Sequence, residues 1–124
     1  MDKPIVGITM GDPAGIGPEI CAKALASSEV HVIANCLVIG DKRALRDGLK
    51  AAKILNIEIN SVRKVSEAKF SRGVIDVLDL NNVGPALKLG QVSKAAGKAA
   101  VEYLEKAIKL ALDGQIDAIA TGPI

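Results

Sequence analysis

The sequence has 124 residues, of which 49% are hydrophobic and 24% are charged, and its formal net charge is +2. This length and apolar content fit one compact domain and exclude an intrinsically disordered chain. The basic residues form no run with interleaved aromatics, and only Phe70 and Tyr103 could stack on bases. We therefore predict no nucleic-acid partner.

The sequence also argues against a membrane or secreted protein. No apolar run approaches the roughly 18 to 20 residues that a membrane-spanning helix needs. The first residues lack the basic and long apolar regions of a signal peptide. Cys21 and Cys36 lack the spacing of a metal-binding pair, and we interpret them as reduced core cysteines of a cytoplasmic protein.

The hydrophobic pattern of the first half predicts strands that alternate with helices. Residues 4–9 are a short apolar run typical of a buried strand, and residues 18–26 favour a helix capped by Gly17. A second strand is predicted over residues 30–39. The pattern of residues 42–55 is that of an amphipathic helix.

The second half continues the alternation. Strands are predicted over residues 57–65, 74–80 and 116–121, and a long helix over residues 93–112. Strands that alternate with helices predict an α/β fold with an open, largely parallel sheet and helices on both faces. Because the sequence ends directly after a strand, where such a sheet binds ligands, we expect the fold to be incomplete.

Three smaller expectations concern individual side chains. The long helix is expected to turn one apolar face inward, made of Val101, Leu104, Ile108 and Ala111. Asp76 and Asp79 are unusual in a buried strand and indicate that this strand lies at an edge of the sheet. The single histidine, His31, is interpreted as an edge or surface residue rather than a catalytic or metal-binding one.

In the stretch GITMGDPAGIGPEI, residues 7–20, three glycines and two prolines lie between a strand and a helix: Gly11, Pro13, Gly15, Gly17 and Pro18. It is not a P-loop, because Pro18 and Glu19 stand where that motif needs Lys and Ser or Thr. It is also a poor Rossmann fingerprint, since the third glycine is missing. An ordinary dinucleotide fold remains an alternative, with Asp41 after the second strand as its ribose-binding acid.

This turn still suits an anionic or backbone-binding ligand. Free N–H groups and the positive dipole end of a helix follow it, and Gly15 and Gly17 would let a ligand reach the backbone. Asp12 either caps the turn through its own backbone or contacts the ligand. The stretch TGPI places Thr121 and Gly122 at the tip of another strand, so both loops could face one crevice.

Together, GITMGDPAGIGPEI, GQVSKAAGKAAVEYLEKAI and IDAIATGPI resemble the N-terminal part of the 4-hydroxythreonine-4-phosphate dehydrogenase family over essentially the whole chain. GDPAGIGPE is also similar to the GDGIGPE turn of isopropylmalate and isocitrate dehydrogenases, which share the fold. The resemblance implies that residues 1–124 are the N-terminal segment of a two-domain, homodimeric subunit that binds its cofactor in a non-Rossmann cleft.

The family resemblance implies an NAD- or NADP-dependent oxidation of the secondary alcohol of 4-phosphohydroxy-L-threonine, with decarboxylation, in pyridoxal phosphate biosynthesis. Relatives instead oxidise 4-phospho-D-threonate or 4-phospho-D-erythronate, and residues 7–20 and 65–79 look slightly closer to these. A divalent zinc, magnesium or cobalt ion is implied, with histidine ligands downstream of residue 124. We therefore expect the 124 residues alone to be inactive. A non-catalytic α/β module whose loops bind a phosphorylated ligand or a partner chain is the alternative of a different class.

Site residues carry over from the family as follows. The cofactor is expected to contact the turn at Gly11, Asp12, Ala14, Gly15, Ile16 and Gly17. The substrate is expected to contact Thr121, Gly122 and Pro123.

Overall fold

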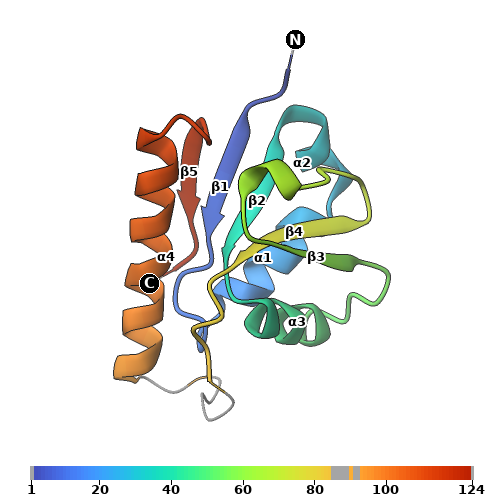
Figure 1. Ribbon diagram of the computed structural model, residues 1–124. Coiled ribbons are helices and arrows are strands. Elements are labelled where there is room, and N and C mark those ends of the chain that lie inside the picture. Colours follow the sequence, from blue (N-terminus) through green and yellow to red (C-terminus); the bar gives the residue numbers. More distant parts are fainter. Residues whose placement is uncertain (1, 85–89, 91–92, 124) are drawn as a thin grey trace.

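The computed structural model describes residues 2–84, 90 and 93–123 and contains one parallel five-stranded sheet (Figure 1). The strands are β1 (Ile5–Thr9), β2 (Asn35–Gly40), β3 (Glu58–Val62), β4 (Val74–Asp79) and β5 (Ala118–Thr121). The helices are α1 (Gly17–Ala26), α2 (Ser28–Ile33), α3 (Lys42–Ala51), the 3-10 turn η1 (Val65–Glu67) and α4 (Lys94–Leu112). The strand order is β3-β4-β2-β1-β5, and all four neighbouring pairs are parallel.

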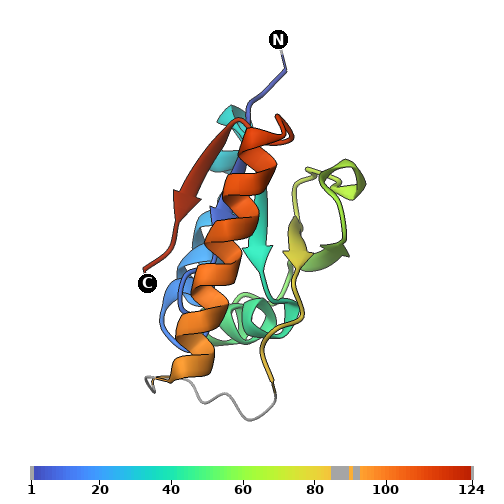
Figure 2. The same cartoon turned by 60° about the vertical axis from the view of Figure 1, so that its left-hand side comes forward.

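Helices cover both faces of this sheet, which confirms the predicted fold class. Helices α1 and α3 pack side by side on one face, whereas α4 lies on the other face against β1, β2 and β5 (Figures 1 and 2). The central strand β2 is buried on both sides, and Leu37, Val38 and Ile39 have no exposed surface. A run of apolar residues without alternation is what a strand covered on both faces requires.

The predicted second strand is wrong in its first half. Residues 28–33 form the short helix α2, and β2 begins only at Asn35. Ser27 starts this helix, because its Oγ accepts a hydrogen bond from the Glu29 N–H at 3.3 Å. His31 therefore lies on a helix, half-buried, with Nε2 3.0 Å from the Leu25 carbonyl oxygen.

The interpretation of Asp76 and Asp79 as edge markers is also wrong, because β4 lies between β3 and β2. Asp76 is only 1% exposed. Its carboxylate accepts hydrogen bonds from Asn60 Nδ2 at 2.8 Å and from the backbone N–H groups of Lys69 and Phe70 at 3.0 and 2.9 Å. The β3–β4 connection folds back to supply these donors, and a buried carboxylate is tolerated when it is bonded in this way.

Helix α4 has the predicted extent but not the predicted inner face. Ser93 caps it by accepting a hydrogen bond from the Ala96 N–H at 3.1 Å. The buried residues are Ala96, Ala99, Ala100, Tyr103, Ala107 and Leu110. Val101 and Ile108 are instead 52% and 45% exposed. Small alanines let the helix lie close to the sheet around the two large buried side chains, Tyr103 and Leu110.

Candidate functional site

The connections of this sheet diverge around β1. From β1 the chain passes through α1 to β2 on one side, and α4 later returns it across the sheet to β5 on the other side (Figures 1 and 2). In open parallel sheets, ligands bind outside the carboxyl ends of the strands at such a reversal. The turn after β1 and the segment after β5 both lie at this edge.

The structure brings the two predicted loops into direct contact. The Gly122 N–H donates to the Thr9 carbonyl oxygen at 2.8 Å, and the Asp12 N–H donates to the Pro123 carbonyl oxygen at 3.0 Å. The Met10 N–H donates to the Ile39 carbonyl oxygen at 3.0 Å, which extends the contact to the end of β2. The turn and the TGPI segment therefore form one corner.

The crowding of glycine in this corner has a structural cause. Gly11 has a φ of +76°, and a Cβ built on it would lie 2.2 Å from the Pro123 carbonyl oxygen. A Cβ on Gly17 would lie 1.9 Å from the Met10 carbonyl oxygen, and one on Gly122 would lie 2.6 Å from the same atom. These buried glycines let backbone pack on backbone within the chain itself.

Asp12 caps its own turn, which is one of the two roles that the sequence predicted for this side chain. Its Oδ1 accepts a hydrogen bond from the Ala14 N–H at 2.8 Å, and its carbonyl oxygen accepts one from the Gly15 N–H at 3.0 Å. Ala14 is buried, whereas Gly15 and Ile16 are exposed, Ile16 by 63%. The part of the turn that is open to a ligand is therefore the pair Gly15 and Ile16.

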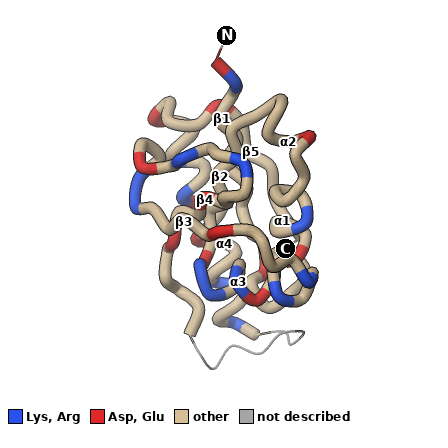
Figure 3. The backbone as a smooth tube through the Cα atoms, turned by 90° about the vertical axis from the view of Figure 1, so that its right-hand side faces the viewer, with Lys and Arg blue, Asp and Glu red and all other residues tan. Residues whose placement is uncertain are grey.

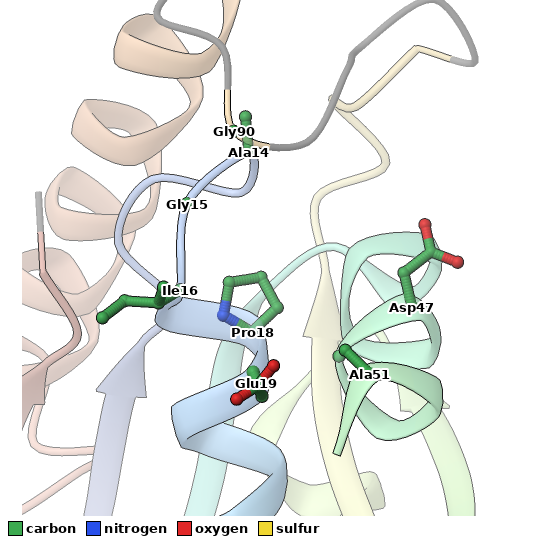
Figure 4. Close-up of a pocket in the computed structure, with 9 residues that line it drawn as sticks. Ala14, Gly15, Ile16, Pro18, Glu19, Asp47, Ala51 and Gly90 are labelled. Atoms are coloured by element: carbon green, nitrogen blue, oxygen red, sulfur yellow. The ribbon is translucent and has the colours of Figure 1, made fainter. Parts of the chain in front are cut away.

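A cavity of about 260 Å³ opens beside this pair, between the turn, the start of α1 and helix α3 (Figure 4). It is lined by Ala14, Gly15, Ile16, Pro18, Glu19, Asp47, Gly48, Ala51 and Gly90. Carboxylates come from Glu19, which pairs with Lys23 at 3.0 Å, and from Asp47. Two carboxylates and an otherwise apolar lining favour a hydroxyl-bearing or apolar ligand group over a phosphate.

The cavity contains three of the nine residues that the resemblance assigns, namely Ala14, Gly15 and Ile16. The residues from α1 and α3 were missed, because no sequence motif links them to the turn. Of the TGPI residues, Thr121 and Pro123 are exposed and Gly122 is buried. The Thr121 hydroxyl donates to the Gly122 carbonyl oxygen at 2.8 Å.

Asp41, the ribose-binding acid of the Rossmann alternative, has a different role. It is 1% exposed, and its Oδ1 accepts hydrogen bonds from the N–H groups of Arg43 at 2.8 Å and Ala44 at 3.2 Å. Its Oδ2 accepts one from the Val83 N–H at 3.1 Å. Asp41 is therefore the N-cap of α3, and the alternative loses its ribose ligand.

The buried Tyr103 and the half-buried Asn82 form a pair behind this edge. The Tyr103 hydroxyl donates to Asn82 Oδ1 at 2.8 Å. Burial first, and then the neighbouring Asp41 and Asp79 carboxylates, raise the pKa of Tyr103 above its ordinary value. The phenol therefore stays a neutral hydrogen-bond donor.

The implied divalent metal does not fit the part of the chain that the structure describes. Among residues 2–84, 90 and 93–123, no three His, Cys, Asp or Glu side chains are grouped so that they could hold a metal ion. None of the helices in the same ranges is long and apolar enough to span a membrane.

Comparison with known proteins agrees with the resemblance. The chain is 47% identical over 124 residues to a Clostridium botulinum protein named "Putative D-threonate 4-phosphate dehydrogenase", covering 99% of this chain and 37% of that protein. It superposes on the crystal structure of a 4-hydroxythreonine-4-phosphate dehydrogenase from Burkholderia phymatum with a TM-score of 0.94 and 40% identity, covering 98% of this chain and 36% of that one. The corresponding enzyme from Klebsiella pneumoniae gives a TM-score of 0.89 and 38% identity, with coverages of 98% and 37%.

The chain thus spans about 37% of the length of the curated relative from Clostridium botulinum. Residues 32–124 match the sequence profile of the family described as "Pyridoxal phosphate biosynthetic protein PdxA". The match covers most of the chain, and the fold agrees with that of the solved structures. The chain belongs to the PdxA family.

Proposed function

We propose that the protein carrying this chain is an NAD- or NADP-dependent dehydrogenase that oxidises the secondary alcohol of a phosphorylated four-carbon hydroxy acid. The observation that carries the proposal is the similarity over nearly the whole chain to PdxA-family proteins named for such reactions. The 47% identity to the Clostridium botulinum protein favours D-threonate 4-phosphate as the substrate. The TM-score of 0.94 to the Burkholderia phymatum enzyme supports 4-phosphohydroxy-L-threonine as a second candidate substrate. This substrate would be decarboxylated after oxidation.

In this proposal the two loops of the corner have different tasks. Thr121, Gly122 and Pro123 form a wall of the substrate side, and the Gly11–Gly17 turn borders the cofactor. Within the turn, Gly15 and Ile16 offer the contact surface, while Gly11, Asp12 and Gly17 hold the turn in shape. The exposure of Gly15 and Ile16, next to the α1 N-terminus and the cavity, supports this division.

The nicotinamide cofactor would accept the hydride when bound, and this chain contributes orientation and shape. Because the described residues form no metal-ligand set, any divalent metal would need ligands from elsewhere in the protein. The homodimer implied by the resemblance stays a prediction.

The test is an assay of the purified protein encoded by the complete gene, with D-threonate 4-phosphate, D-erythronate 4-phosphate and 4-phosphohydroxy-L-threonine as substrates. The absorbance of reduced nicotinamide is followed with NAD+ and with NADP+, with and without added divalent metal. We expect the highest kcat/KM with D-threonate 4-phosphate. A higher kcat/KM with 4-phosphohydroxy-L-threonine would favour the second candidate, and turnover of none of the three would favour the non-catalytic module.

A further inference from the structure

A second hollow lies away from the carboxyl edge, between α3 and the edge strand β3. Its volume is about 280 Å³. It is lined by Lys42, Arg46, Leu49, Lys50, Ile54, Leu55, Ile57 and Ile59. Figure 3 shows the basic residues of α3 on the side of the molecule that carries β3. We call this hollow the α3–β3 groove.

The groove combines three cations with an apolar floor. Lys42, Arg46 and Lys50 recur every four residues and so share one face of α3. Among the described residues, none of the three has an acidic partner within salt-bridge distance. Unpaired cations above an apolar floor favour an anionic, amphipathic partner.

Apolar surface is left uncovered at the rim of the groove. Leu49 is buried, but Leu55 at the rim is 91% exposed. Asp47, the one acid of α3, lines the cavity at the carboxyl edge instead of this groove. The acidic residue of α3 therefore lines the cavity at the carboxyl edge, whereas Lys42, Arg46 and Lys50 line the α3–β3 groove.

The edge of β3 adds a backbone component. In the part of the chain that the structure describes, β3 pairs only with β4, and the Glu58 N–H points inward to the Gly73 carbonyl oxygen at 2.9 Å. Since successive N–H groups of a strand point to opposite sides, those of Ile59 and Ser61 point away from β4. Within the described part of the chain, no hydrogen bond is made by either group. A strand edge that residues 2–84, 90 and 93–123 leave open in this way is a template for another strand.

The spacings of the two features match. Cations four residues apart on a helix are separated by about 6 Å along its axis. Alternate side chains of an extended strand are separated by about 6.7 Å. A strand added to β3 would place alternate side chains on the face of Ile57 and Ile59, which lines the groove below the cations.

From this geometry we propose that the α3–β3 groove binds an extended acidic segment of a partner protein, which pairs with the free edge of β3 and sets alternating carboxylates against Lys42, Arg46 and Lys50. This is the strand-addition mode of peptide recognition. A second copy of the chain fits less well, because pairing two β3 edges would bring two basic α3 faces together. The proposal does not depend on the dehydrogenase activity.

The test measures binding of a fluorescein-labelled peptide in which Glu alternates with Val, by fluorescence anisotropy with the full-length protein. We expect saturable binding that is weakened by about tenfold or more in the double variant Arg46→Glu/Lys50→Glu. The matched control, Lys98→Glu/Lys109→Glu, makes the same charge change on exposed positions of α4 and leaves the affinity within about twofold.

Two further arms separate strand pairing from simple charge attraction. Ser61→Pro removes one outward N–H at an edge position that tolerates proline, and it is expected to weaken binding without loss of the fold. A peptide with Gln in place of Glu is expected to bind much more weakly. The proposal is overturned if the Glu peptide does not bind, if Ser61→Pro leaves its affinity unchanged, or if a dT oligonucleotide binds the same cations with equal affinity. Dehydrogenase activity stays unchanged in all these variants.

Discussion

At the scale of single residues, the corner at the carboxyl edge depends on glycines that touch the chain's own backbone. Replacing Gly17 by Ala would force a Cβ to within 1.9 Å of the Met10 carbonyl oxygen. We expect the free energy of unfolding to fall by more than about 2 kcal/mol in urea titrations. Gly97→Ala is the matched control, because its Cβ meets nothing within 4 Å and lies inside α4. That variant should be more stable by about 0.5 to 1 kcal/mol, and equal effects of the two changes would contradict the explanation.

Asp41 provides a test between a helix cap and a ribose ligand. Asp41→Ala removes the cap of α3 and leaves the Val83 N–H without its acceptor. We expect a loss of about 2 to 4 kcal/mol in stability, and a smaller loss for Asp41→Asn, which still caps a helix. If instead Asp41→Ala kept full stability and lost NAD affinity, the ribose role would be restored.

The buried Cys21 thiol makes the stability of the protein vary with pH in the alkaline range. Burial raises the pKa of its thiol from 9.0 to about 11. As the pH rises, the Cys21 thiol ionises in the unfolded chain before it ionises in the folded one. Its contribution to the free energy of unfolding is therefore fully present below pH 9 and is lost as the pH rises to about 11. We expect the free energy of unfolding to fall by about 2 to 3 kcal/mol across this range from this group. In Cys21→Ala the slope should be shallower, and an unchanged slope would show that Cys21 does not contribute.

At the scale of the elements, Asp76 ties the β3–β4 connection to the sheet. Asp76→Ala would leave the N–H groups of Lys69 and Phe70 and the Asn60 amide without their acceptor. We expect a loss of at least about 3 kcal/mol, together with faster amide hydrogen exchange at Lys69 and Phe70. Unchanged exchange at these two amides would mean that other contacts hold the connection.

Much of the order of elements was predictable, because apolar runs and caps are local signals. Residues 4–9 and α4 follow from such patterns, with Ser93 as a sequence-readable cap. Helix α2 was not predicted, because Val30 and Val32 favour a strand. In the structure, the Ser27 cap outweighs this preference and residues 28–33 are helical. The predicted inner face of α4 was wrong because the helix buries Tyr103 and small alanines, whereas the larger aliphatic side chains of Val101 and Ile108 are exposed.

At the scale of the whole molecule, the parallel sheet determines which loops meet. The contact between the Gly11–Gly17 turn and TGPI follows from the strand topology, since the carboxyl ends of β1 and β5 are neighbours. The cavity beside Ile16 was not predictable, because it depends on how α1 and α3 pack. Asp47 and Glu19 are far apart in sequence, and only this packing brings them to one hollow.

We propose above all that the exposed part of the Gly11–Gly17 turn borders the nicotinamide cofactor. The most direct test is the KM for NAD+ or NADP+ of an Ile16→Asp variant. Ile16 is 63% exposed, so the substitution should leave the fold and its stability intact. We expect the KM for the cofactor to rise by about tenfold or more, with a smaller change in kcat. Ile33→Asp is the control, since Ile33 is 70% exposed on α2 away from the turn, and it should change neither constant. An unchanged cofactor KM in Ile16→Asp, in a folded and active enzyme, would contradict the account.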